Sequence, residues 1–235
     1  MKKNKLIYLV VTLILITVSF FGISKVTDNI YKSEKLVFNE NNTTELSEQS
    51  KYTVGNYYLV KDNWILGKFS KIIQDDKMQI YADAINTLSN NARTQNKDVY
   101  FISMTHKTNM LKHLYPDFVM NKENIDLNKQ SFKSKLDKNN ISFIDIDGYF
   151  LSNFTESQRE KFYFKTDHHW NGLGAFEGFK FMINNVNLGL SNDTINSYLD
   201  GYRIKEVKEK EFLGSYNRKL NLIVKEKEFA NYVYR

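Results

Sequence analysis

The chain has 235 residues, 42% of them hydrophobic and 14% aromatic, so it can bury the core of one ordinary domain and is not an intrinsically disordered chain. Its formal net charge is +6, but 33 basic residues face 27 acidic ones and the lysines are scattered, so we expect no nucleic-acid partner. It has no cysteine, which excludes disulfides, thiolate metal sites, cysteine nucleophiles and a lipid-bearing lipoprotein cysteine.

The chain begins with a lysine-rich stretch and a long apolar run. Met1–Lys5 holds three lysines, and Leu6–Ile23 is apolar apart from small and hydroxyl-bearing residues. About 18 to 20 apolar residues cross a bilayer as a helix, and lysines before them stay cytoplasmic. We therefore predict a signal anchor over residues 1–24, which makes this a single-pass protein of the bacterial cell membrane with an extracytoplasmic globular part. A cleaved signal peptide is the alternative, and a polar linker is expected over residues 25–55.

Short apolar runs and helical spacing predict the first elements of the globular part. Tyr57–Val60 and Trp64–Gly67, joined by Lys61–Asn63, predict a β-hairpin. Apolar residues at helical spacing predict a helix over about 75–94, and the apolar run Val99–Ile102 predicts a strand buried on both faces.

The following elements continue the alternation of helix and strand. They are a helix from about Ile125 to Lys138, a strand Ile141–Ile146 ended by Gly148, a short third strand at Tyr163–Phe164, and a helix from Leu173 to about Asn187. This order predicts an α/β domain with a parallel sheet over residues 56–190. The charged segment 191–235 has no assigned structure. Functional groups are expected just beyond the strand ends, at Ser103–Lys107 and at Asp145 and Asp147.

The segment Thr166–Trp170 carries the most chemical content. If it is extended, Asp167 and His169 share one face and His168 lies on the other. A carboxylate two residues before an imidazole can accept a hydrogen bond from its Nδ1–H, which leaves Nε2 free to take a proton from a hydroxyl nucleophile.

The spacing leaves two other interpretations open. In the first, Asp167 caps a helix that starts near His168 while Trp170 packs into the core. In the second, Asp167 and the paired histidines bind a metal, although the remaining ligands, such as His106 and His113, have no placement from sequence.

A longer stretch around these residues resembles a known family. Lys165–Trp170, followed by Asn171–Phe176, resembles the signature of the DHHW family, which is similar to the alginate O-acetyltransferase branch of the SGNH-hydrolase-like proteins. Tyr58–Trp64 resembles their entrance segment, and Met104–Lys107 stands where relatives often carry Pro-x-Lys. The resemblance spans Asn56 to about Leu220 and implies a three-layer SGNH-hydrolase-like domain with a mainly parallel sheet, which we expect to be incomplete in this chain.

The resemblance also implies a function. Asp167 would be the orienter and His169 the base of a serine triad, with Trp170 and Lys107 as substrate contacts and with no cofactor or metal. A serine would take an acetyl group and a sugar hydroxyl would then receive it. The implied protein is an exported O-acetyltransferase or acetylesterase of a cell-surface polysaccharide, with a membrane O-acyltransferase as acetyl donor.

The nucleophile does not follow from the family pattern. Relatives carry it downstream of the histidine in a Gly-Asp-Ser-like or Asp-Ser-aromatic segment, which none of Ser191, Ser197 and Ser215 matches. Ser215 is the candidate in this chain, and Ser103 is the alternative. We expect a C-terminally truncated relative whose chain stops before the nucleophile region. Two other functions stay open, namely a catalytically incomplete module that binds polysaccharide or an export complex, and a metal-dependent hydrolase.

Overall fold

Seventeen short helices and strands make up the part of the chain that the structure describes. A computed structural model describes residues 52–235, apart from the side chain of Lys210. The predicted anchor over residues 1–24 and the linker up to residue 51 lie outside the described residues. Within residues 52–235 no helix combines the length and the apolar character that a membrane span requires.

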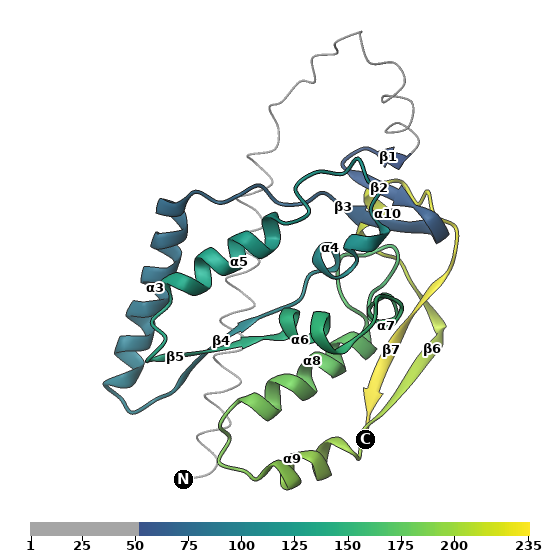
Figure 1. The fold of residues 1–235 in the computed structure, drawn as a ribbon. Coiled ribbons are helices and arrows are strands. Elements are labelled where there is room, and N and C mark those ends of the chain that lie inside the picture. The colour runs from purple at the N-terminus through teal and green to yellow at the C-terminus, as the bar shows by residue number, and fades with distance from the viewer. Residues whose placement is uncertain (1–51) are drawn as a thin grey trace. The chain divides into compact units, whose positions relative to one another are not determined.

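The elements follow one another in the order shown in Figure 1. They are β1 (Thr53–Val54), β2 (Tyr57–Val60), η1 (Lys61–Asn63), β3 (Trp64–Gly67), α3 (Asp75–Arg93), β4 (Val99–Ser103), α4 (Lys107–Met110), η2 (Lys112–Leu114), α5 (Asn124–Lys135), β5 (Ile141–Asp145), α6 (Ile146–Asn153), α7 (Glu156–Glu160), α8 (Gly172–Asn185), α9 (Asn192–Leu199), β6 (Arg203–Phe212), α10 (Ser215–Lys219) and β7 (Glu228–Tyr234).

The parallel pair β4–β5 has helices on both faces, as the helix–strand alternation predicted. Val99 pairs with Ile141 and Ser103 with Asp145, and successive side chains point to opposite faces. One face packs against α3 and α5 through the residues Ala82, Ile85, Val99, Phe101, Phe132, Leu136, Ile141 and Phe143. The other face packs against α6 and α8 through Tyr100, Ile102, Ile144, Ile146, Phe150, Leu173, Phe181 and Met182. The three layers of an α/β domain are therefore present.

Two details of the predicted sheet are wrong. Tyr163–Phe164 is not a third strand, because Tyr163 forms only an isolated antiparallel bridge with Trp170. Gly148 does not end the second strand but lies inside α6, which begins directly after Asp145. The Asp145 carboxylate caps that helix by accepting the Gly148 N–H at 2.9 Å, and this early cap cuts the strand short.

The described sheets are consequently small and mixed. The predicted hairpin is confirmed, with Val60 paired to Trp64, and β1 extends it to three antiparallel strands. The tail that had no assigned structure forms the antiparallel pair β6–β7 with α10 between the strands. Residues 52–235 belong to one compact unit.

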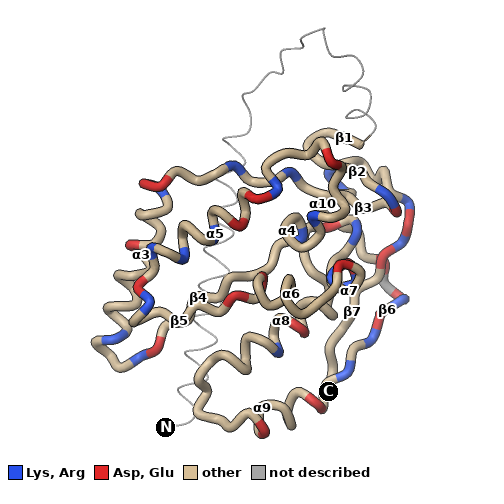
Figure 2. Tube along the Cα trace, in the orientation of Figure 1, with Lys and Arg blue, Asp and Glu red and all other residues tan. Residues whose placement is uncertain are grey.

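Charged residues of both signs alternate along the described trace. Figure 2 shows lysines and arginines interspersed with aspartates and glutamates rather than collected on one stripe. The C-terminal pair β6–β7 also carries charges of both signs, and Lys227 pairs with Glu211 at 3.5 Å.

Truncating the centre of the larger core is expected to destabilise the domain strongly. Phe150 is fully buried and its ring lies 5.1 Å from that of Phe162 and 5.4 Å from that of Phe154. We expect Phe150→Ala to lower the free energy of unfolding by about 3–5 kcal/mol through lost burial and a cavity. The matched control Phe179→Ala, at a side chain that is 39% exposed, should lose about 1 kcal/mol or less. Urea unfolding measures both values, and equal losses would contradict this description of the core.

Candidate active site

The Asp-His-His-Trp segment forms a bent loop between α7 and α8. The helix after it begins at Gly172 and is capped by Asn171, whose side-chain oxygen accepts the N–H groups of Leu173 and Gly174. The alternative in which Asp167 caps this helix is therefore wrong. Asp167 is free for another role, and its side chain is only 3% exposed.

The Asp167 carboxylate accepts hydrogen bonds from two separate parts of the chain. Its Oδ1 accepts the backbone N–H of His169 at 2.9 Å and lies 2.7 Å from Nδ1 of the same residue. Its Oδ2 accepts the backbone N–H of Ser215 at 2.5 Å. A carboxylate cannot donate, so Nδ1 carries the proton of the imidazole and Nε2 is its free acceptor. The His169 side chain is 65% exposed, which leaves that nitrogen open to a reacting group.

His168 lies beside His169 rather than on the opposite face. The two ring centroids are 3.6 Å apart, and Nδ1 of His168 lies 3.3 Å from Asp167 Oδ1. The predicted alternation of faces is wrong because residues 165–169 are bent instead of extended.

Ser215 lies at this site, although its hydroxyl contacts His168 and not the predicted base. Its Oγ is 3.0 Å from His168 Nδ1. Within residues 52–235 no serine hydroxyl is hydrogen-bonded to His169. Ser103 ends β4 in register with Asp145 and makes no hydrogen bond to the Asp167–His169 dyad in this part of the chain. The structure thus brings Ser215 to the dyad, through its N–H on Asp167 and its hydroxyl on His168.

Of the two residues predicted to contact substrate, Lys107 is buried and Trp170 is half-buried. Lys107 is 1% exposed, and its ammonium donates to the carbonyl oxygens of Ile65, Lys165 and Asp167. All three protons are therefore used, which contradicts a direct substrate contact. Trp170 packs on the Phe150 core, and a Cβ added at Gly178 would lie 2.7 Å from its ring. Trp170 therefore packs against the core, and its contact with substrate stays a prediction.

Sequence reasoning missed the residues that hold the loop from the C-terminal tail. The Glu228 carboxylate accepts the N–H groups of Lys165 and Thr166 and the hydroxyl of Thr166. The Thr166 carbonyl accepts the N–H groups of Tyr216 and Asn217 at 3.2 Å each. Glu228 is some sixty residues from Lys165 and Thr166, Tyr216 and Asn217 are about fifty residues from Thr166, and no spacing in the sequence indicates that these residues meet.

The ionisation of the site follows from burial and hydrogen bonding. Burial alone would raise the pKa of Asp167, but hydrogen bonds from His169 and from the Ser215 N–H outweigh it and hold the pKa well below its usual range. Burial, with repulsion from the neighbouring cations, lowers the pKa of His106 to about 4. Burial and the adjacent His169 lower the pKa of His168. At neutral pH His106 and His168 are therefore uncharged, and Asp167 is ionised.

The same three residues could also hold a metal ion. Asp167, His168 and His169 each present one ligand atom, and these atoms lie within 4.8 Å of one another. His113, which was considered as a further ligand, pairs instead with Glu160 through its Nε2 at 2.8 Å. The described part of the chain thus offers three protein ligands, the number that catalytic zinc sites use.

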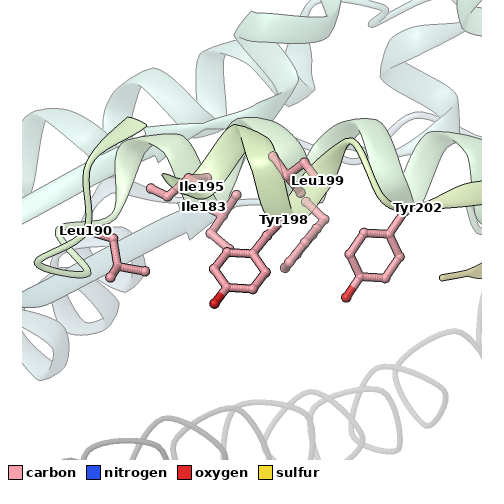
Figure 3. Close-up of a pocket in the computed structure, with 7 residues that line it drawn as sticks. Ile183, Leu190, Ile195, Tyr198, Leu199 and Tyr202 are labelled. Atoms are coloured by element: carbon pink, nitrogen blue, oxygen red, sulfur yellow. The ribbon is translucent and has the colours of Figure 1, made fainter. Parts of the chain in front are cut away.

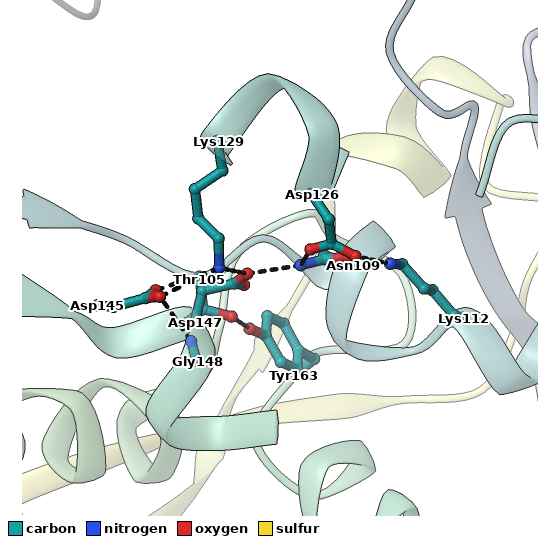
Figure 4. Close-up of polar contacts among 9 residues, drawn as sticks. All are labelled: Thr105, Asn109, Lys112, Asp126, Lys129, Asp145, Asp147, Gly148 and Tyr163. Atoms are coloured by element: carbon teal, nitrogen blue, oxygen red, sulfur yellow. Dashed lines mark hydrogen bonds and ion pairs between the residues drawn. The ribbon is translucent and has the colours of Figure 1, made fainter. Parts of the chain in front are cut away.

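The polar residues beyond β4 and β5 form a network of their own (Figure 4). Lys129 pairs with Asp145 at 3.2 Å and with the buried Asp147 at 2.9 Å, and Asn109 donates to Asp147 at 2.6 Å. Burial raises the pKa of Asp147 in spite of these partners. The network joins α4, α5 and α6 at the strand ends, so the expected functional position of Asp145 and Asp147 is occupied by structural contacts.

An apolar pocket of about 210 Å³ lies between α8 and α9, and no residue of the dyad lines it (Figure 3). Its lining consists of Phe179, Ile183, Leu190, Ile195, Tyr198, Leu199 and Tyr202.

The hydrogen bonds to Asp167 predict a pH dependence of stability. A folded-state pKa below the unfolded value of about 3.9 contributes stability that is present above that value and is lost as the pH falls toward the folded pKa. We expect the free energy of unfolding of the native chain to fall by about 1 kcal/mol more than that of Asp167→Asn between pH 6 and pH 3. Urea unfolding at the two pH values measures the difference, and other carboxylates cancel between the two proteins. Parallel losses would show that the carboxylate has no special partners.

The close approach of the tail predicts a requirement for glycine at position 214. A Cβ there would lie 2.1 Å from the Thr166 carbonyl oxygen, so Gly214→Ala must push α10 away from the loop. We expect a loss of about 1–3 kcal/mol of unfolding free energy. Ser215→Ala is the matched control, because it removes only the hydroxyl and keeps the N–H on Asp167, and its loss should be about 1 kcal/mol or less. A Gly214→Ala protein as stable as the native chain would be incompatible with this contact.

Comparison with known proteins shows the family of the chain. The sequence model described as the SGNH hydrolase-like domain of acetyltransferase AlgX matches residues 60–232. No curated protein matches the chain.

Two solved structures of PatB1 agree with this chain in fold, and AlgX is a further, more distant match. The structure of Bacillus cereus PatB1 is 25% identical with a TM-score of 0.60, covering 75% of this chain and 57% of its own. PatB1 with a sulfonyl adduct is 26% identical with a TM-score of 0.61, covering 75% and 54%. Pseudomonas aeruginosa AlgX is 14% identical with a TM-score of 0.48, covering 79% and 47%.

The chain spans little more than half the length of PatB1. The family model, in contrast, covers most of the chain, from β2 to β7. The chain therefore belongs to the family of SGNH hydrolase-like acetyltransferase domains typified by AlgX.

Proposed function

We propose that this chain is an exported O-acetyltransferase or acetylesterase of a cell-surface polysaccharide, with Asp167 as the orienter and His169 as the base. Within the acetyltransferase family to which it belongs, we assign it to the DHHW type on the segment Lys165–Phe176. The observation that carries the proposal is the 2.7 Å contact between Asp167 Oδ1 and His169 Nδ1, on a carboxylate that is 3% exposed and an imidazole that is 65% exposed.

This arrangement supports the acid–base half of an acyl transfer. Asp167 fixes the ring and stabilises the imidazolium that forms when Nε2 removes the proton of a hydroxyl nucleophile. The oxygen then attacks the acetyl carbonyl, the donor oxygen leaves with the proton from His169, and a covalent acetyl ester remains. A sugar hydroxyl or water, deprotonated in turn by His169, releases the acetyl group and restores the nucleophile.

The proposed location and partners rest on the sequence. The apolar run Leu6–Ile23, after three lysines, supports a single membrane anchor with the domain outside the cell. A domain tethered there would be within reach of envelope polysaccharide and of a membrane O-acyltransferase, which we propose as the acetyl donor.

A second candidate function has an observation of its own. The Ser215 hydroxyl contacts His168, and none of the serine hydroxyls in residues 52–235 contacts His169. A chain without a working nucleophile would keep the fold and bind polysaccharide, or a partner in an export complex, without turnover.

Active-site labelling separates these functions. We expect a serine-reactive sulfonyl fluoride to add once to the full chain, and peptide mapping to locate the serine. Turnover of p-nitrophenyl acetate and of an O-acetylated oligosaccharide should fall about 10²–10⁴-fold in His169→Ala, because a positioned general base contributes about that factor. His113→Ala is the matched control, since His113 pairs with Glu160 outside the site, and it should react and turn over like the native chain.

Three other outcomes of these experiments would contradict the proposed function, and each would point to a different conclusion. Unchanged turnover in His169→Ala would remove His169 as the base. Oligosaccharide binding by a folded chain with neither adduct nor turnover would establish the binding module instead. Turnover that is lost to a chelator and restored by zinc would assign Asp167, His168 and His169 to a metal-dependent hydrolase.

A further inference from the structure

A buried lysine, Lys107, contacts the loop of residues 165–169 that carries the Asp167–His169 dyad. Lys107 is the first residue of α4 and is 1% exposed, although lysine is rarely buried unless it is paired. Its ammonium donates to the carbonyl oxygens of Ile65 at 2.8 Å, Lys165 at 2.7 Å and Asp167 at 2.9 Å. The three donor positions of the ammonium are thus matched by three backbone acceptors.

The two acceptors in the loop are the carbonyl oxygens of Lys165 and Asp167, and the distance between them shows that the loop is not extended. In an extended strand, equivalent atoms of residues i and i+2 are about 6.6 Å apart. The oxygens of Lys165 and Asp167 both lie within 2.9 Å of one nitrogen, so they are closer together than a strand allows. The loop is therefore bent at Lys165–Asp167, where two carbonyl oxygens accept hydrogen bonds from the Lys107 ammonium. This bend places the Asp167 carboxylate in contact with the His169 imidazole.

The groups that neighbour the Lys107 ammonium favour its charged form, whereas its burial opposes it. Its nitrogen lies 4.9 Å from the centroid of the Trp64 ring and 5.8 Å from that of Tyr216, both within cation–π range. The acidic groups that face it are Glu228 and Asp167, both of which favour its charged form, while burial lowers its pKa to about 7. Removal of the ammonium would leave the Ile65 and Asp167 carbonyls without this donor in a dry interior, a costly arrangement for polar groups.

We propose that Lys107 is a positioning residue of the Asp167–His169 dyad: its ammonium ties the carbonyls of Lys165 and Asp167 to that of Ile65 on β3 and so fixes the orientation in which the carboxylate meets the imidazole. The inference rests on the proposed role of the dyad as orienter and base. It gives the lysine of the Met104–Lys107 segment a role through the backbone instead of a contact with substrate.

The test combines removal of the ammonium with a direct view of His169. In the full chain labelled with ¹⁵N-histidine, NMR reports the tautomer of each ring, and the signals of His169 are those absent from His169→Ala. We expect Lys107→Met to change His169 from a single Nδ1–H tautomer to a mixture. Turnover should fall about 100-fold in kcat with little change in KM, as for a misplaced catalytic group. Lys112→Met is the matched control, because Lys112 pairs with Asp126 and contacts no residue of the dyad, and it should leave His169 unchanged.

Chemical rescue keeps the proposal falsifiable where Lys107→Met folds poorly. The chain has no cysteine, so Lys107→Cys carries the sole thiol. Alkylation in urea with 2-bromoethylamine and refolding restores an ammonium on a side chain of lysine length, whereas 1-bromopropane gives a neutral side chain of the same length. We expect native His169 signals only with the ammonium.

The outcomes separate this inference from the proposed function. Native His169 signals in Lys107→Met or in the propyl-bearing protein, or failure of the ammonium-bearing protein to regain them, would overturn the positioning role. Absence of turnover in the native chain would overturn the proposed function alone, since the tautomer of His169 is read without any reaction.

Discussion

A buried negative charge must be hydrogen-bonded. The buried Asp167 carboxylate therefore needs donors that only the folded domain can bring to it. One of its oxygens is satisfied locally by His169, but the other takes its donor from the Ser215 N–H, 48 residues further along the chain. The tail must therefore return to the loop, and α10 must present its first N–H groups there. The absence of a side chain at Gly214 permits this approach, and the β6–β7 pair supports it.

The backbone of the loop is held by charges of opposite sign. The Lys107 ammonium donates to the carbonyl oxygens of Lys165 and Asp167, and the Glu228 carboxylate accepts the N–H groups of Lys165 and Thr166. Both charged groups come from distant elements, α4 and β7, and each neutralises part of the other's field, as the effect of Glu228 on the pKa of Lys107 indicates. The loop that carries the dyad is thus held by two charged groups from distant elements, which is how preorganised sites are supported.

Local patterns were enough to predict much of the fold and the central pair of the site. Apolar patterns predicted the helices α3, α5 and α8, the hairpin β2–β3 and the parallel pair β4–β5, because apolar residues recur at the helical period in the helices and stand in short runs in the strands. The contact between Asp167 and His169 joins residues that are two positions apart, so it could also be predicted from the sequence. Ser215, Glu228 and the ammonium of Lys107 reach the loop only through tertiary structure, and the bend of residues 165–169 depends on them. The alternation of His168 and His169 therefore could not be predicted correctly from the sequence.

The contrast in exposure within the dyad separates the roles of its two members. Asp167 is 3% exposed and accepts its hydrogen bonds from His169 and Ser215, which fits the proposed role of orienting the imidazole. His169 is 65% exposed and uses Nδ1 for that contact, so the nitrogen that can exchange a proton is the one facing outward. A metal bound by all three residues would need Asp167 to exchange these donors for a cation. The hydrogen bonds that depress the pKa of Asp167 hold its carboxylate on His169 and on the Ser215 N–H, and this is the arrangement that the proposed role of His169 as a base requires.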